Sequence, residues 1–168
     1  GKIIIQQSAA ILTAGATRTL SFDGYFFNDL GVQGVKSWTN NGQDANGAWS
    51  YTKTGADMVL NYPDGTTSSW NHTHTSTLIE GGETPTLLDN VWSVTGNTNG
   101  LNRQGNAFSS TIVEPLIKKA ICRWISDGTI ELTRGDRSAT LDFGEGTCDR
   151  FGRLTLENGD TRIIRLRL

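Results

Sequence analysis

Apolar and polar residues alternate one by one along most of this chain, and turn-forming residues interrupt the alternation at short intervals. A period of two places successive side chains on opposite faces of an extended strand, so it favours sheets and disfavours helices. Residues 129–133 and 138–143 alternate in this way on either side of Gly135-Asp136. The pattern predicts an all-β fold of successive antiparallel hairpins, arranged as a β-sandwich or as one elongated sheet.

Three further segments bear on this prediction. Asn158-Gly159 separates two alternating segments, and this dipeptide is typical of a type I′ turn because both of its residues tolerate positive φ. Pro63-Asp64-Gly65 predicts a second tight reversal. Residues 113–120 are the one stretch with a helical alternative, in which Pro115 would occupy the first helical position. We expect an extended crossover there instead.

A length of 168 residues fits one domain, which we assign to residues 1–168. Two segments, 20–83 and 84–168, echo each other loosely in the order of their aromatic strands and glycine turns, and Thr84-Pro85-Thr86 reads as the linker between them. The echo favours a pseudo-repeat within the single domain.

The charge balance and the motif inventory exclude several classes of function. A net charge of −2 offers no electrostatic basis for binding nucleic acid, and the apolar run at residues 3–5 is too short to cross a membrane. No segment matches a nucleophile elbow, a phosphate-binding loop, a zinc-protease helix or a glycosidase carboxylate pair. We therefore expect a chain without enzymatic activity, cofactor, nucleic-acid partner or transmembrane segment.

Two groups of residues are weak candidates for a metal site. His72 and His74 are two residues apart and would share one face of a strand, although polar, solvent-facing side chains explain them better. Asp142, Glu145 and Asp149 lie in a glycine-rich loop that matches no known calcium motif, so an acidic turn is the preferred interpretation. We expect no metal at either group.

The five tryptophans could stack on sugar rings, although each also fits a core position in a strand. Trp38 and Trp70 lie in stretches rich in Ser, Thr and Asn, so they are the ones we expect at the surface. They are the candidate stacking residues for a surface glycan.

The two cysteines, Cys122 and Cys148, match neither a zinc site nor a thiol-redox motif. A reactive thiol is one interpretation. A disulfide between neighbouring strands, closing a loop of 25 residues, is the one we favour. It would stabilise the fold by about 3 kcal/mol and would indicate a location outside a reducing cytoplasm.

Both ends of the chain form apolar, strand-like segments, and exposed edge strands pair readily with other chains. The two ends either pair within one molecule, as in a monomer, or exchange between molecules and build a homo-oligomer or a fibre. The candidate strand-exchange residues are Ile3, Ile4, Ile5, Ile163, Ile164 and Leu166.

Four motifs, in a fixed order, resemble a group of uncharacterised exported lipoproteins of Bacteroidetes-type bacteria. They occupy residues 82–96, 102–109, 114–125 and 141–149 and include a Cys-Arg-Trp strand and a Gly-Thr-Cys-Asp turn. The resemblance covers residues 20–168 and implies an exported location and a Cys122–Cys148 pair, but no activity. The chain starts at Gly1, as a mature or trimmed chain would, and lacks the lipidated cysteine, so anchoring rests on the resemblance alone.

These observations together predict a non-enzymatic, exported protein of the cell surface or extracellular space. Its leading role is structural or adhesive, with self-assembly through the terminal strands. A glycan-binding module that uses exposed tryptophans is the alternative.

Overall fold

The computed structural model describes residues 1–166, and every regular element in this range is a β-strand. The strands are β1 (Lys2–Gln7), β2 (Thr17–Asp23), β3 (Tyr25–Phe27), β4 (Leu30–Gln43), β5 (Trp49–Asn61), β6 (Thr67–Glu80), β7 (Val91–Leu101), β8 (Ala107–Lys119), β9 (Asp127–Arg134), β10 (Arg137–Glu145), β11 (Phe151–Leu156) and β12 (Thr161–Arg165). These residues include no helix of the length and apolarity needed to cross a bilayer.

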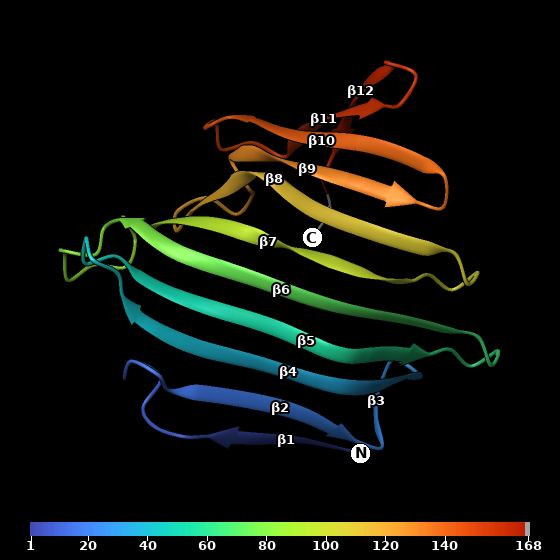
Figure 1. The fold of residues 1–168 in the computed structure, drawn as a ribbon, viewed down its shortest axis with the longest axis horizontal. Helices are drawn as coiled ribbons and strands as arrows, with labels where there is room; N and C mark the ends of the chain where they lie inside the picture. The colour runs from blue at the N-terminus through green and yellow to red at the C-terminus, as the bar shows by residue number, and fades with distance from the viewer. Residues whose placement is uncertain (167–168) are drawn as a thin grey trace.

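All twelve strands belong to one antiparallel meander, which confirms the all-β prediction and selects the elongated sheet over the sandwich (Figure 1). The strand order is β1-β2-β4-β5-β6-β7-β8-β9-β10-β11-β12, and the short β3 pairs with β4 beside this path. The sheet continues without a break across the predicted linker, because β6 pairs with β7. The pseudo-repeat of residues 20–83 and 84–168 stays a prediction.

The hairpins lie where the alternation places them, but one turn type differs. Gly135-Asp136 joins β9 to β10, and residues 113–119 are extended within β8. The type I′ assignment at Asn158-Gly159 is wrong. Only Gly159 has positive φ, and its N–H donates to the Leu156 carbonyl, so the loop is a type I turn followed by a left-handed glycine.

The period of two sorts the side chains onto two chemically different faces. The polar face carries rows of hydroxyl and amide groups, such as Thr52 and Thr75, whose oxygens lie 3.4 Å apart across β5 and β6. The apolar face carries aliphatic and aromatic rows, such as Ile130, Leu141 and Leu154 across β9, β10 and β11. A sheet of this kind normally packs its apolar face against another layer.

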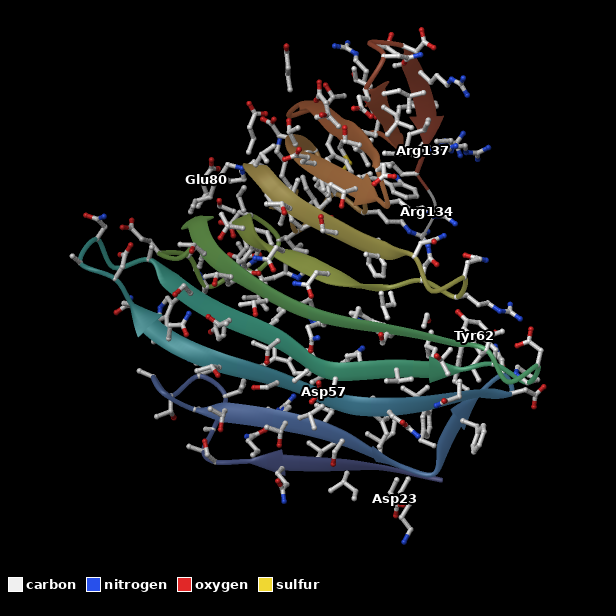
Figure 2. All side chains as sticks on the ribbon, turned by 45° about the vertical axis from the view of Figure 1, so that its right-hand side comes forward. Asp23, Asp57, Tyr62, Glu80, Arg134 and Arg137 are labelled. Atoms are coloured by element: carbon white, nitrogen blue, oxygen red, sulfur yellow. A yellow bond between two sulfur atoms is a disulfide. The ribbon has the colours of Figure 1, made fainter. Side chains whose placement is uncertain are left out.

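No second layer covers the apolar face in residues 1–166 (Figure 2). The accessible surface is 10583 Å². A compact monomer of this length exposes about 8,100 Å². The buried apolar residues of the described range are Ala16, Met58, Val91, Leu116 and Cys122. The fold therefore leaves an unusually large apolar area open to solvent.

Several glycines with positive φ lie where the ladders shift register. Among them are Gly34, Gly96, Gly128 and Gly144, with φ of 110°, 131°, 99° and 95°. Bulges of this type bend a strand and increase its twist. In Figure 1, β12 accordingly runs steeply across the direction of β4 to β6.

Replacing Gly96 tests this bending device. A Cβ at Gly96 would lie 2.1 Å from the Thr73 carbonyl oxygen, whereas one at Gly105, a hairpin tip with φ of 78°, would meet nothing within 4 Å. Both substitutions strain the backbone by about 1 kcal/mol. We expect Gly96→Ala to lower the free energy of unfolding by a further 1–3 kcal/mol or so because β6 must move. Chemical denaturation of both variants measures the difference, and equal losses would contradict this role.

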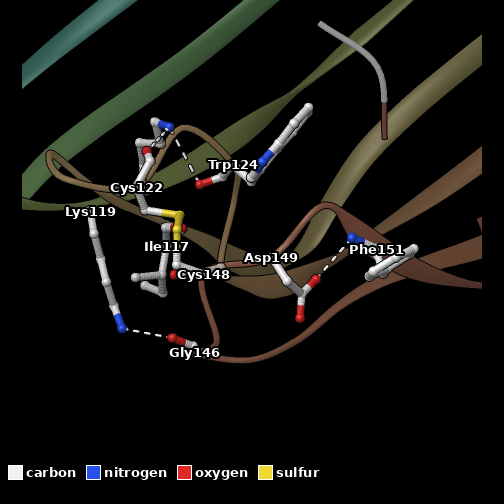
Figure 3. Close-up of a disulfide and its surroundings, with 10 residues drawn as sticks. Ile117, Lys119, Cys122, Trp124, Gly146, Cys148, Asp149 and Phe151 are labelled. Carbon is white, nitrogen blue, oxygen red and sulfur yellow. Dashed lines mark hydrogen bonds between the residues drawn. A yellow bond between two sulfur atoms is a disulfide. The ribbon is translucent and has the colours of Figure 1, made fainter. Parts of the chain in front are cut away.

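A disulfide joins Cys122 to Cys148, with a Cα–Cα distance of 5.7 Å (Figure 3). This confirms the predicted pairing, but the cysteines lie in the β8–β9 and β10–β11 loops and not in neighbouring strands. Lys119 Nζ donates to the Gly146 carbonyl at 2.7 Å and joins the end of β8 to the β10–β11 loop.

The terminal strands lie at opposite edges of the sheet. β1 pairs with β2 alone and β12 with β11 alone, so the expectation that the two ends pair within one molecule is wrong. Ile5 is 61% exposed and Ile163 is 67% exposed. The Leu166 N–H extends the β11–β12 ladder by donating to the Arg150 carbonyl at 2.8 Å.

Candidate binding site

A hollow of about 770 Å³ lies on the apolar face, over the middle strands of the sheet. Its floor consists mainly of aromatic and aliphatic side chains from β4 to β7, and we call it the aromatic hollow. The floor residues are Trp38, Trp49, Tyr51, Leu78, Trp92 and Val94, and the wall residues are Leu12, Lys53, Ser76, Leu87, Asn90 and Lys118.

Strand periodicity and cross-strand register bring the floor together. Trp49 and Tyr51 are two residues apart on β5, so both face the hollow. Tyr51 lies opposite Ser76 on β6, and Leu78 of that strand lies opposite Trp92 on β7. The Tyr51 and Trp92 rings are 5.8 Å apart at 59°, within the range of favourable aromatic pairs.

A buried asparagine fixes the loop that forms one wall. Asn40 is fully buried, and its Nδ2 donates to the Ile11 carbonyl at 3.0 Å. Its backbone carbonyl accepts from the Gly15 N–H at 2.7 Å. These bonds hold the β1–β2 loop against the end of β4, where Leu12 overhangs the hollow. Leu12 is itself 73% exposed, so the wall ends in an apolar rim.

A second asparagine, Asn90, carries an unused polar group. It is 8% exposed, and its Oδ1 has no hydrogen-bond partner among the described residues. Its backbone carbonyl accepts from the Ala120 N–H at 2.8 Å, which places it beside the end of β8. This oxygen faces Gly81. Unpaired buried amides are costly and uncommon in native proteins, so rotation of the amide toward a polar ligand atom in the hollow would be favourable.

Lys118 is a partly desolvated cation beside Asn90 in the wall. It lies opposite Trp92 in the register, and its Nζ donates to the Cys122 carbonyl and, at 3.3 Å, to the Trp124 carbonyl. Burial lowers the pKa of Lys118 below its ordinary value. The ion pairs of residues 1–166 join arginines to aspartates elsewhere, so no carboxylate neutralises this ammonium group.

His72 and His74 lie on β6 outside the lining of the hollow, and their rings stack at 5.4 Å. Burial, followed by repulsion from Lys36, lowers the pKa of His72. Burial, His72 and Lys53 lower the pKa of His74. The charged side chains that lower these two pKa values are therefore lysines, together with the His72 imidazole in the case of His74. Residues 1–166 hold no cluster of three potential metal ligands.

The two histidines predict a pH dependence of stability. Because their folded pKa values lie below the ordinary 6.5, the unfolded chain binds protons first as the pH falls through 6.5. Stability is then highest above pH 6.5, falls with acidification, and levels off below the folded pKa values. NMR titration of the imidazole protons measures both pKa values, and Lys53→Gln should raise the pKa of His74. Values at or above 6.5 would contradict the burial.

A second, polar hollow of about 650 Å³ adjoins the first and shares Trp49 and Leu78 with it. Its walls include the carboxylates of Glu80, Glu83 and Asp89. Thr84 donates to one of them, Asp89, at 2.7 Å. These acidic groups therefore lie outside the lining of the aromatic hollow, whose charged residues are Lys53 and Lys118.

The two stacking residues predicted from the sequence lie in different places. Trp38 lies in the floor of the aromatic hollow, but Trp70 lies farther along β6, opposite Met58. The acidic loop behaves as a turn: Asp142 accepts from the Gly144 N–H and Asp149 from the Phe151 N–H, at 2.7 and 2.8 Å.

The sequence analysis missed Trp49, Tyr51 and Trp92 as site residues. The spacing of Trp49, Tyr51 and Lys53 does show that these three side chains share a face. The partner strand and its register were needed to show that Trp92 joins them, and that information is not local in the sequence.

No known protein family matches the chain, and neither a curated protein nor a solved structure matches it. The resemblance to exported lipoproteins therefore stays a prediction. The features that bear on function are the geometry of the hollow and the free edges of the sheet.

Proposed function

We propose that this chain is a non-enzymatic, exported binding protein that holds a ligand in the aromatic hollow. One observation carries the proposal: several aromatic side chains converge on a hollow of about 770 Å³. Cavities that bind small molecules measure about 300 to 1,000 Å³ and combine apolar walls with a few polar groups. The aromatic hollow has this size and this composition.

The chemistry of the wall supports binding and not catalysis. The lining residues include no Asp, Glu, His or Cys, so the lining offers Ser76 no carboxylate or imidazole that could activate it as a nucleophile. Burial of apolar ligand surface would supply the affinity, at about 0.8 kcal/mol for each methylene group removed from water. The same burial would cover part of the open apolar face of the sheet.

Two neighbouring leucines test the proposal. Leu87 is 75% exposed at the rim of the hollow, while Leu88 is 68% exposed and lies outside the lining. We expect Leu87→Asp to weaken binding of the neutral apolar dye Nile red about tenfold, because a hydrated carboxylate replaces an apolar contact. Leu88→Asp should bind as the wild type does. Fluorescence titration measures both.

Two results would contradict the proposal: no saturable binding of Nile red, or equal loss of binding in the two variants. A parallel titration with cellohexaose tests the glycan alternative. If the sugar displaces the dye and apolar chains do not, the ligand class is a glycan and not an apolar molecule.

A structural role through self-assembly is the second candidate, and the two free sheet edges favour it. Ile3, Ile4 and Ile5 of β1 are 43%, 44% and 61% exposed, and nothing covers the outer side of this strand within residues 1–166. Open edges can accept a strand from another molecule. Pairing of β1 with β12 of a second copy would continue the meander and propagate.

We expect the wild type to form concentration-dependent oligomers, and Ile4→Lys together with Ile163→Lys to prevent them. Lysine side chains on edge strands oppose pairing because their charges must be brought together and desolvated. Light scattering after size-exclusion chromatography, over a hundredfold or so range of concentration, measures the change. Monomers at every concentration of the wild type would refute assembly.

A further inference from the structure

We propose that the aromatic hollow binds a single-chain amphiphile, with the chain across the aromatic floor and an anionic head group between Lys118 and Asn90. This inference rests on the proposed function and specifies the chemical class of its ligand. The class covers long-chain carboxylates and alkyl phosphates, which share an extended apolar chain and an acceptor-rich anion.

The floor favours an alkyl chain over a sugar. Trp38, Trp49, Tyr51 and Trp92 form it together with aliphatic side chains. Sugars carry hydroxyl groups around each ring and need many hydrogen-bond partners, because a polar group buried without one is costly. The neutral polar side chains of the wall are Ser76 and Asn90 alone. A chain of methylene groups makes no such demand.

At one place in the wall, an anionic group would supply the hydrogen bonds that Lys118 and Asn90 lack. An ammonium group has three donors, and Lys118 directs two of its hydrogen bonds to the Cys122 and Trp124 carbonyls. Its third donor and its charge have no partner in residues 1–166. Asn90 contributes an amide that is more than nine-tenths buried and whose Oδ1 is unpaired. Rotation of this amide presents either a donor or an acceptor to the same head group.

The two residues reach this place from different directions. Lys118 lies near the end of β8, opposite Trp92, and Asn90 precedes β7 beside Ala120. A head group here lies at one end of the floor, so its chain extends over Trp92 and Tyr51 toward Trp38. Lys53 in the opposite wall is exposed, and water satisfies its charge.

The charge signs in the two hollows support an anionic ligand. The aromatic hollow has lysines and no carboxylate in its wall, and the adjoining polar hollow has Glu80, Glu83 and Asp89. A cationic amphiphile would meet repulsion in the first. The charge asymmetry within a chain of net charge −2 therefore selects the sign of the head group.

Displacement of Nile red by hexadecanoate, hexadecyl phosphate and hexadecanol tests the proposal on the full chain, with the anions below their micellar concentrations and the alcohol below its solubility limit. We expect the two anions to displace the dye at concentrations about tenfold lower than the alcohol, because hydrogen bonds to a charged group are the stronger ones. A difference between the two anions distinguishes a carboxylate from a phosphate ligand.

Lys118→Gln should abolish the preference for the anions, and Lys118→Arg should retain it. Lys119→Gln is the matched control, because Lys119 is the adjacent residue on β8 and also donates to a loop carbonyl but lies outside the hollow. The Lys119→Gln variant should prefer the anions over the alcohol as strongly as the wild type does. The ratio of alcohol to anion concentrations is compared within each variant, so a change in overall affinity does not affect the result.

Two outcomes would overturn this inference: equal displacement by alcohol and anions in the wild type, or loss of the preference in Lys119→Gln but not in Lys118→Gln. Both leave the proposed function intact, because the dye still binds. Failure of Nile red to bind would instead refute the proposed function itself.

Discussion

The structure depends on the packing of a sheet that is apolar on one face and has no second layer over that face. Apolar surface left in water forgoes about 25 cal/mol per Å², so an open sheet gains less from burial than a sandwich of the same length. Its stability rests on continuous ladders and on contacts between neighbouring side chains, such as Tyr51 with Trp92. The Cys122–Cys148 disulfide adds about 3 kcal/mol at the C-terminal end.

The local features of the fold could be predicted from the sequence, and the non-local ones could not. The β9–β10 hairpin and the disulfide follow from alternation, turn residues and a single available pair of cysteines. The turn at Asn158-Gly159 was misassigned because the same dipeptide fits two turn types, which only the loop length distinguishes. The aromatic hollow requires the register of β4 to β7, and bulges such as the one at Gly34 shift that register.

The two proposed activities use different parts of the molecule. The hollow lies over β4 to β7, whereas the free edges are β1 and β12. A ligand in the hollow does not obstruct the edges, and a strand added at an edge does not cover the hollow. An assembly built through the edges would therefore present one hollow for each copy.

The nearest-neighbour order of the strands also has a consequence for the kinetics of folding. Every ladder of the described residues joins consecutive strands, except that β2 reaches β4 past the short β3. Such topologies close short loops only, and proteins rich in local contacts fold faster than sandwiches with distant pairings. Each hairpin can form as soon as its second strand is available, and growth then proceeds along the chain. The last-added β11 and β12 and the outermost β1 are the segments in which hydrogen exchange begins first.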